Sequence, residues 1–559
     1  MIGGRRVVEH LDAGGGFSFW WTSLLAEKSI FKSPRIADCL RLLALGELVE
    51  QVKCARLTLI SPDAVLARAT EALCRSRGIA FDWRRCEPAV RPRLARRLHD
   101  ALPHVGQGAI QLVRHAIGRW PLRRGRPSAW HGGDRAVTLI SYFFAFDAAA
   151  ASAGRFSQRQ WEELPGLLQR AGIDSNWLHH FLYGPDAPSA ARAVDLLQRF
   201  NTGGSQGAHG FVDAALSPRV LLQILRRWLR LLVTAIRLRP IQDRCTPAGS
   251  RVPLWALLRD DWYSSIVGTA AVVHLTLFAL FDRALGAFPH QQLGLYLCEN
   301  QGWERTLIAA WRRHGHGRLV AVQHSTVRSW DLRYADDPRT VQAREAFAMP
   351  LPDHVAVNGP VAWSAFAQAG YAVDRLVAVE ALRYQHLAAA APRRHGAAGP
   401  LRRVLILGDF RASATTRMLA CADAAFRLHP DPPSFVLRCH PACQIDPAPL
   451  TAVVEVSDQS LTELMAECDA VFSSNTTSAG LDAYLAGLPV IVFLNDDGLN
   501  VSPLRGITGV PFVSDGPQLA AALDQVRGGA ESAVPEFFWL DPQLPRWRGL
   551  LAEAGLPVG

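Results

Sequence analysis

The ten cysteines of this 559-residue chain lack the regular spacing of a disulfide framework or of a zinc finger. Only Cys439 and Cys443 lie close together, with His440 between them, and no second pair at zinc-site spacing accompanies them. We therefore expect reduced, mostly buried thiols and no bound zinc. A signal-peptide pattern is also missing, because Arg5-Arg6 is not followed by a continuous apolar run. Both absences predict a cytoplasmic protein.

Hydrophobic runs long enough to cross a membrane are missing as well. The longest, residues 266–281, is about 16 residues long and contains His274, whereas a membrane-spanning helix needs roughly 20 residues. We expect this run to form a buried helix. No internal repeat of fixed period is present, which argues against a solenoid or a propeller.

Acidic residues are the minority among the charged side chains. Lys and Arg number 60 against 50 Asp and Glu, which gives a net charge of +10, and nearly all of the basic residues are Arg. Such an excess suits an anionic substrate, an anionic membrane surface or nucleic acid. Because no basic motif with interleaved aromatic residues is found, nucleic acid is the least favoured, and we expect no nucleic-acid partner. The composition, 49% hydrophobic and 20% charged, is that of a globular protein.

One segment concentrates this basic charge. Its arginines are spaced by seven, four and seven residues, which places them on one stripe of a helix: Arg219, Arg226, Arg230 and Arg237. Leucines and Trp228 lie between them. A basic amphipathic helix of this kind can lie on an anionic bilayer, here the inner face of the cell membrane, or it can be a solvated face over a packed core. The spacing leaves both interpretations open.

The chain contains no Asp-X-Asp motif. Its three adjacent pairs, Asp260-Asp261, Asp336-Asp337 and Asp496-Asp497, direct their side chains apart in an extended chain. The usual short motif that holds a nucleotide diphosphate through a divalent metal is therefore missing. A phosphate site without a metal or any other cofactor fits this sequence better.

Short apolar runs that end in polar residues alternate with helical patterns along the second half of the chain. They comprise residues 293–298, 319–322, 354–357, 403–409, 436–441, 469–478 and 487–494. The alternation predicts successive β/α units of parallel sheets. Residues 387–400, small and rich in Gly and Pro, form the clearest linker. We predict an α/β fold with an N-terminal domain at 1–386, carrying a helical insertion at about 155–290, and a C-terminal domain at 401–559.

Ligands of parallel sheets sit beyond the carboxyl ends of the strands. In the C-terminal domain a histidine follows one predicted strand, with a proline that fixes the chain there, and a cluster of hydroxyl side chains follows the next, where a helix begins. Free N–H groups and the helix dipole favour a phosphate at that point. The predicted phosphate-binding set is Gly408, Asp409, Arg438, His440, Pro441, Ser473, Ser474, Asn475, Thr476, Thr477 and Ser478.

Three residues of the N-terminal domain are candidates for a catalytic base. Glu299 directly follows the predicted strand 293–298, and a carboxylate facing a cleft can take a proton from a hydroxyl nucleophile. Glu304 lies one helical turn further on, where it can instead simply complement the helix dipole. His324 ends the next strand and is a rival base or a phosphate contact.

The order of His440-Pro441 and, some thirty residues later, Ser473-Ser474 resembles the HP and Ser/Thr motifs of bacterial GT-B sialyltransferases and of related Kdo transferases. The resemblance implies two Rossmann-like domains facing across a cleft and a CMP-activated sugar donor. It further implies that His440, Ser473 and Ser474 contact the CMP phosphate. The family's acidic-Gly motif, which carries the base, corresponds loosely to Glu299-Asn-Gln-Gly302.

The whole chain also resembles an uncharacterised family of surface carbohydrate biosynthesis proteins from O-antigen-type clusters. The similar segments are Trp20–Lys28, Ile140–Phe143, Gln323-His324 and Ser474–Gly480. This implies an inverting glycosyltransferase of polysaccharide or lipopolysaccharide synthesis, with a nucleotide-sugar donor and a saccharide or lipid-linked saccharide acceptor. Teichoic acid glycerophosphotransferases share a late Ser-rich turn, so a CDP-alcohol donor stays open. A non-catalytic scaffold that binds a nucleotide or glycolipid is the other alternative.

Overall fold

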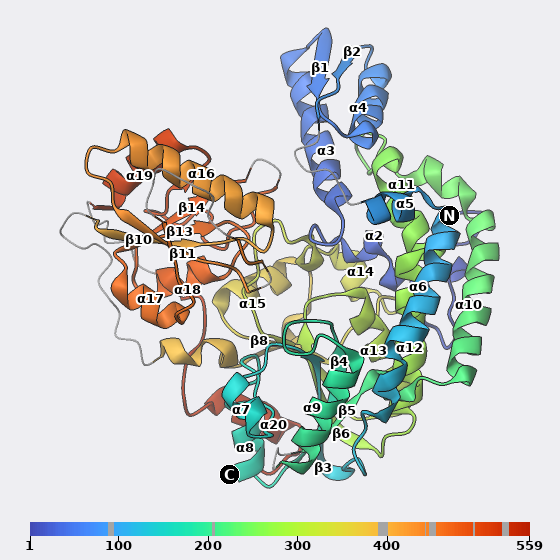
Figure 1. Cartoon of the computed structure of the whole chain (residues 1–559). Helices are drawn as coiled ribbons and strands as arrows, with labels where there is room; N and C mark the ends of the chain where they lie inside the picture. The colour runs from blue at the N-terminus through green and yellow to red at the C-terminus, as the bar shows by residue number, and fades with distance from the viewer. Residues whose placement is uncertain are drawn as a thin grey trace.

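The computed structural model describes residues 1–87, 94–203, 207–388, 401–441, 443–445, 454–495, 498–527 and 536–558. Two separate parallel sheets form the centres of two domains, which lie side by side in Figure 1, and a small third sheet projects from one of them. The helices are α1 Val7–His10, α2 Leu24–Glu27, α3 Pro34–Val52, α4 Ala64–Ser76, α5 Leu94–Ala101, α6 His104–Arg119, α7 Ala148–Ser152, α8 Leu164–Arg170, α9 Ala190–Thr202, α10 Pro218–Arg237, α11 Trp255–Ile266, α12 Thr269–Leu285, α13 Gly302–Arg313, α14 Pro338–Gln342, α15 Pro360–Gln368, α16 Ala412–Leu428, α17 Leu461–Glu467, α18 Ala479–Leu485, α19 Gly516–Arg527 and α20 Pro545–Glu553.

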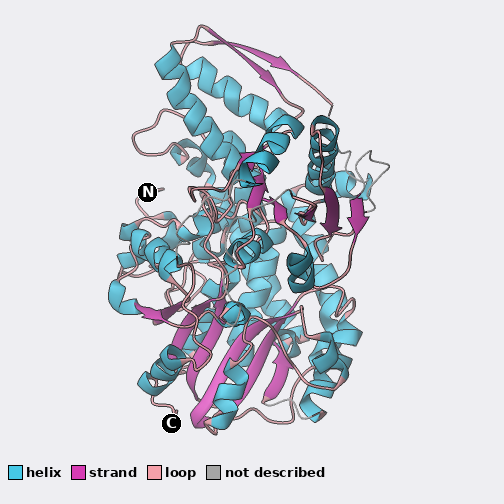
Figure 2. Cartoon of the chain, turned by 90° about the vertical axis from the view of Figure 1, so that its left-hand side faces the viewer, coloured by secondary structure: helices cyan, strands magenta, loops and turns pink. Residues whose placement is uncertain are grey.

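The N-terminal domain is built on a seven-stranded parallel sheet in the order β5-β4-β3-β6-β7-β8-β9. Its strands are β3 Gly133–Phe143, β4 Asp174–Phe181, β5 Ala208–Phe211, β6 Gln291–Cys298, β7 Arg318–Gln323, β8 His354–Val357 and β9 Leu376–Ala378. Nearly every residue of β4, β6 and β7 is buried, as expected of a parallel sheet covered by helices on both faces. Figure 2 shows these strands side by side between helices.

The C-terminal domain repeats this design with six parallel strands in the order β12-β11-β10-β13-β14-β15. They are β10 Arg403–Leu407, β11 Ser434–Arg438, β12 Val454–Val456, β13 Ala470–Ser474, β14 Val490–Phe493 and β15 Phe512–Val513. Alternate residues of β10 enter different cores: Val404 and Ile406 pack with α16 and α19, whereas Leu405 and Leu407 pack with α17 and α18.

Both sheets have the strand order of a doubly wound Rossmann fold, so the predicted α/β class with two Rossmann-like domains is confirmed. In such sheets the strand order reverses at one point, and a crevice forms there beyond the strand ends. This point lies between β3 and β6 in the N-terminal domain and between β10 and β13 in the C-terminal domain. Glu299 and Asp409 follow β6 and β10, so both lie at these crevices.

The predicted helical insertion at about 155–290 is wrong in part, because this segment also supplies β4 and β5 of the central sheet. The β4 sequence contains Asn176, His179 and His180, whose polar side chains hide a strand that the structure buries on both faces. The β5 strand has only four residues and gives too short a periodic signal. The predicted run 57–60 does form a strand, β1 Arg56–Ile60, but it pairs with β2 Ala80–Arg84 in the small projecting sheet.

The predicted C-terminal boundary also needs correction. The last described segment, 536–558, leaves the C-terminal domain, and α20 packs into the core of the N-terminal domain through Trp547, Leu550 and Leu551. The Trp547 indole donates to the Glu380 carbonyl at 2.9 Å. A domain boundary read from the linker pattern alone misses such a return. Most of the linker at 387–400 lies outside the described residues.

The apolar run at 266–281 forms the buried helix that its length predicts. Residues 269–281 of this run lie in α12, which packs against α6, α10, α11 and α13, whereas Ile266 is the last residue of α11. By length and composition, the stretch Trp255–Leu285 is the one candidate membrane span among the described residues, but 78% of its apolar window is buried inside the fold. The helix is therefore placed as a core helix of the N-terminal domain.

Burial shifts the pKa of three of the buried histidines of the N-terminal domain. Burial lowers the pKa of His180 and of His274 to about 3, and it lowers the pKa of His179 well below its ordinary value. They are therefore neutral in the folded protein near pH 7. The unfolded chain binds more protons than the folded one below the ordinary pKa of 6.5, so these residues destabilise the fold as the pH falls from 6.5 towards 3.

We expect the variant His274→Gln to weaken this pH dependence. Between about pH 6 and pH 4, the slope of the unfolding free energy against pH should be smaller in the variant than in the wild type. The difference between the two slopes should be about 1.4 kcal/mol per pH unit. Denaturant unfolding at a series of pH values measures it. The exposed His131 offers a matched control, and His131→Gln should keep the wild-type slope. An unchanged slope in His274→Gln would contradict the burial argument.

Candidate active site

A charged cluster surrounds Glu299 at the carboxyl end of β6. The chain turns sharply after it, with Asn300 in the left-handed region at φ 54°. The Glu299 carboxylate accepts from the Tyr142 hydroxyl at 3.4 Å and from the Gln301 amide, and Arg333 Nη1 lies 3.8 Å away. Burial raises the pKa of Glu299, but His324 and then Arg333 lower it more strongly, to about 2. Glu299 is therefore ionised at neutral pH.

His324 lies beside this carboxylate, directly after β7. Its Nε2 is 3.5 Å from Glu299 Oε1, which is an ion-pair contact longer than an ordinary hydrogen bond. Its side chain is only 7% exposed, and neither ring nitrogen has a full hydrogen-bond partner among the described residues. A buried imidazole held against an ionised carboxylate is arranged to receive a proton, because the carboxylate stabilises the imidazolium.

Glu304 occupies a different environment. It is fully buried, and its two oxygens accept the backbone N–H groups of Glu299, Asn300 and Gln301 at 2.9, 3.1 and 3.0 Å. Burial raises its pKa to about 7 in spite of these hydrogen bonds. The structure therefore places Glu304 in the capping box at the start of α13, whose N-cap residue is Gln301, with its oxygens engaged by backbone and not at the cleft.

In the C-terminal domain, Asp409 organises the crevice between β10 and β13. Its buried carboxylate accepts from the Ser474 hydroxyl at 2.6 Å and from the Thr476 hydroxyl at 2.5 Å. The backbone N–H of Arg411 donates to it at 2.8 Å. The hydroxyls of Ser474 and Thr476 are thus engaged by a carboxylate, which differs from the expectation that they face a phosphate directly.

The other residues of the predicted phosphate set divide by burial. Ser473 and Asn475 are buried; the Ser473 hydroxyl donates to the Ser474 carbonyl, and the Asn475 amide donates to the Leu499 carbonyl. Thr477 caps α18 by accepting from Ala479 N–H at 3.3 Å. Ser478, the N-cap of α18, is half-buried and its side chain makes no cap hydrogen bond. Only Thr476, Thr477 and Ser478 therefore reach the surface of this turn.

His440 and its neighbours lie at the end of β11, next to the same crevice. The His440 ring is half-buried, 6.3 Å from the Phe410 ring, and its carbonyl accepts from Cys443 N–H in the turn that contains Pro441. Burial lowers the pKa of His440; the Asp409 charge opposes this shift and the Arg328 charge adds to it. Gly408 lies at the end of β10, where a Cβ would come 3.3 Å from the Thr415 hydroxyl oxygen.

Arg328 is a site residue that the sequence analysis did not single out. It belongs to the N-terminal domain, four residues after His324, yet its charge acts on His440 of the other domain. Its guanidinium lies 5.6 Å from the Phe31 ring and has no ion pair or hydrogen bond within the part of the chain that the structure describes. Burial lowers its pKa, although the nearby Asp331 charge opposes this shift, which marks a partly desolvated cation. One feature of the sequence points to Arg328 as a site residue: it lies in the loop that follows the predicted strand 319–322.

A cavity of about 270 Å³ joins the two domains at this point. Its walls are Phe31, Pro34, Asp38 and Arg41 from one domain and Phe410, Arg411, Thr476 and Leu499 from the other. Phe31 also lies 5.6 Å from the Arg333 guanidinium, which reaches Glu299. A continuous set of contacts therefore runs from the His324–Glu299 pair, through Arg333 and Phe31, to the cavity and to Thr476 beside Asp409.

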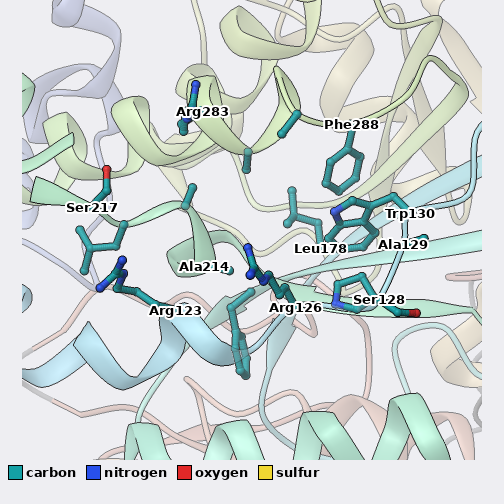
Figure 3. A pocket seen from close by; sticks show the side chains of 16 residues that line it. Arg123, Arg126, Ser128, Ala129, Trp130, Leu178, Ala214, Ser217, Arg283 and Phe288 are labelled. Atoms are coloured by element: carbon teal, nitrogen blue, oxygen red, sulfur yellow. The ribbon is translucent and has the colours of Figure 1, made fainter. Parts of the chain in front are cut away.

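A larger cavity of about 670 Å³ lies away from all of these residues (Figure 3). Trp130 and Phe288, with ring centroids 4.2 Å apart, form one of its walls. Trp130 precedes β3 and Phe288 precedes β6, so this wall lies at the amino-terminal edge of the sheet, whereas Ala214 and Ser217 of the lining follow β5. The predicted site residues lie at the opposite, carboxyl-terminal edge.

No protein-family model and no curated protein matches this chain. Solved structures with a similar arrangement include the calicheamicin glycosyltransferase CalG4 (13% identity, 70% of this chain and 92% of that one, TM-score 0.36). Others are S. aureus MnaA with UDP (9%, 76% and 97%, 0.40) and Acinetobacter baumannii MurG (10%, 71% and 95%, 0.35). These values are too low for any of them to indicate what the present chain acts on. What the structure itself shows is two Rossmann-like domains, each with a parallel sheet of doubly wound strand order.

Proposed function

We propose that this protein is an inverting glycosyltransferase of surface polysaccharide or glycolipid synthesis. It transfers a nonulosonic or Kdo-type sugar from a CMP-activated donor to a saccharide or lipid-linked saccharide acceptor. The observation that carries the proposal is the meeting of side chains across the cleft. The His324–Glu299 pair and Arg328 follow strand ends of the N-terminal domain, and His440, on which the Arg328 charge acts, follows a strand end of the C-terminal domain.

His324 is the base that takes the proton of the acceptor hydroxyl. The pKa of about 2 makes Glu299 a poor base near neutral pH, because a useful base has a pKa close to the working pH. Glu299 instead orients the imidazole and stabilises its protonated form, as a carboxylate does beside a catalytic histidine. Tyr142 and Arg333 hold Glu299 in place from two sides. Glu304, with its oxygens engaged by backbone, supports the turn that presents Glu299.

The leaving phosphate binds between Arg328 and His440. Negative charge builds up on this phosphate as the bond to the sugar breaks, and a preorganised guanidinium stabilises that charge. Arg328 suits this role because it is partly desolvated and makes no ion pair among the described residues, while the nearby Asp331 pairs with Arg333. Asp409, together with the two hydroxyls it binds, forms the polar floor on which the nucleotide rests.

Nucleotide binding tests the donor class. In the presence of EDTA, we expect CMP or CDP to bind more tightly than UDP or GDP in calorimetric titrations, because the site offers side chains and no metal-binding motif for the phosphate. Within the described residues, no group of three or more His, Cys, Asp or Glu side chains is placed to hold a metal. Tighter binding of UDP that required a divalent metal would overturn the CMP assignment.

The reaction products distinguish the proposed function from its two alternatives, a CDP-alcohol transferase and a non-catalytic scaffold. A CDP-alcohol transferase would bind CDP-glycerol and release CMP only from that donor, whereas a non-catalytic scaffold would bind nucleotide and release nothing. Release of CMP from a CMP-nonulosonate or CMP-Kdo in the presence of a saccharide acceptor is the outcome that the proposal requires. The proposal includes a cytoplasmic location and peripheral contact with an anionic membrane through the arginines of α10.

A further inference from the structure

Helix α10 has two apolar faces, and only one of them is used inside the protein. Its buried face consists of Val220, Ile224, Trp228, Leu231 and Ala235, which pack into the core around α12. This accounts for one apolar stripe of an ordinary surface helix.

A second apolar stripe of α10 faces outwards. Its residues are spaced by three, four, four and three positions, and their exposed fractions range from 37% to 61%: Leu222, Leu225, Leu229, Val233 and Ile236. The four arginines 219, 226, 230 and 237 are all exposed and lie beside this stripe. The sequence allowed the arginine-bearing face of α10 to be either a membrane-binding face or a solvated one. Because this face also exposes the apolar stripe, it is not purely polar. No acidic residue occurs in α10, so the arginines have no neutralising partner on their own helix.

The neighbouring helix α6 shows the same feature. Its buried Gly108 faces Trp228 of α10, so the two helices are in contact, and Figure 1 shows them along the same side of the molecule. Its outer surface exposes Ile110, Val113 and Ile117, at 38%, 56% and 72%. Like α10, it contains no acidic residue. Roughly half of the large hydrophobic side chains that are exposed in the described residues lie on α10 and on the segment that runs from α5 through α6 to Trp120.

We infer that the outer faces of α10 and α6 dock on an anionic phospholipid surface, with the leucine stripe of α10 inserted at the headgroup boundary and its arginines against the lipid phosphates. An exposed apolar stripe flanked by arginines matches such a surface in both polarity and charge. A second copy of this chain is a poorer occupant, because it would bring two faces of the same positive sign together. Docking gives the proposed glycosyl transfer access to a membrane-held acceptor, and binding to the membrane does not itself require that activity.

The docked face is continuous with the N-terminal domain's strand ends. A pocket of about 580 Å³ beside α6 is lined by Val113 and Ile117 of the exposed stripe and, at its inner end, by His180. His180 is the penultimate residue of β4, and its ring lies 5.7 Å from that of Tyr142, which bonds Glu299. The lipid surface therefore borders the same edge of the sheet as the proposed base.

Vesicle sedimentation of the full chain tests this docking. We expect binding to vesicles of phosphatidylcholine with phosphatidylglycerol, weakened by salt, and little binding to phosphatidylcholine alone. The double variant Arg226→Ala/Arg230→Ala should lower the partition coefficient roughly 25-fold, since each arginine contributes about fivefold. The double variant Leu229→Glu/Val233→Glu should abolish binding. As matched controls from other exposed sites, Arg339→Ala and Val373→Glu should bind like the wild type.

Several results would overturn the inference. Equal sedimentation with neutral and anionic vesicles, or none with either, would remove the membrane as occupant. A wild-type dimer that Leu229→Glu converts to a monomer would assign the face to a second copy. Thermal melting of each variant shows whether it is folded. Because the sedimentation assay contains no donor or acceptor, its outcome is independent of the glycosyl-transfer proposal.

Discussion

Replacement of His324 by alanine is expected to lower turnover by about 10²–10⁴ and to leave CMP affinity near the wild-type value. In the proposed mechanism the imidazole acts on the acceptor hydroxyl, whereas CMP is held by Arg328 and the C-terminal domain. Single-turnover assays at saturating donor, combined with calorimetric CMP titration, separate the two quantities. Because the substitution removes the base and leaves a space of its shape, added imidazole should restore part of the lost turnover.

Glu299→Gln should also lower turnover, but imidazole should not restore it. Glutamine keeps the shape and most hydrogen bonds of Glu299 and removes the charge that stabilises the protonated imidazole. His314→Ala, at a histidine of the same domain that pairs with Asp282, is the matched control and should keep normal turnover. Normal turnover in His324→Ala would return the base to Glu299 or place acceptor activation outside this edge of the sheet.

The sequence pattern predicted the sheets well because parallel strands and their helices leave a local signal. The β13 run ends in Ser473-Ser474 and the β6 run ends before Glu299, so both crevices could be located from residue order alone. The elements that the sequence did not predict also have identifiable physical causes. The polar side chains of β4 conceal a strand, and α20 returns to the first domain after the sheet of the second is complete, a step that no local pattern records.

The site was harder to predict, because burial decides what each side chain does. The sequence offers both Glu299, the favoured base, and Glu304 as candidates. Only the fold shows Glu299 at the cleft with a pKa of about 2 and Glu304 buried against backbone N–H groups. Likewise, the hydroxyls of Ser474 and Thr476 carry no sign in the sequence that a carboxylate 65 or more positions earlier accepts them. The position of Arg328 near His440 depends on the approach of the two domains, which the order of residues does not reveal.

Arg328→Ala should weaken CMP binding and lower turnover together. A hydrogen bond to a charged group contributes about 1.5–3 kcal/mol, so CMP affinity should fall by roughly 10- to 150-fold. Turnover should fall further, because negative charge increases on the leaving phosphate and the lost interaction is strongest in the transition state. Arg328→Lys keeps the charge without the planar fork and should lie in between. Arg339→Ala, an exposed arginine of the same domain, is the control.

His440→Ala should act in the same direction, since we place both side chains on one phosphate. The double variant Arg328→Ala/His440→Ala should then lose less CMP affinity than the sum of the two single losses, because groups that share a partner are not additive. If the losses of CMP binding free energy in the two single variants add up strictly, Arg328 and His440 contact different parts of the donor. If Arg328→Ala binds CMP like the wild type while His440→Ala does not, the phosphate lies wholly on the C-terminal domain, and the partly buried Arg328 beside Phe31 serves the acceptor or the closure of the cleft instead.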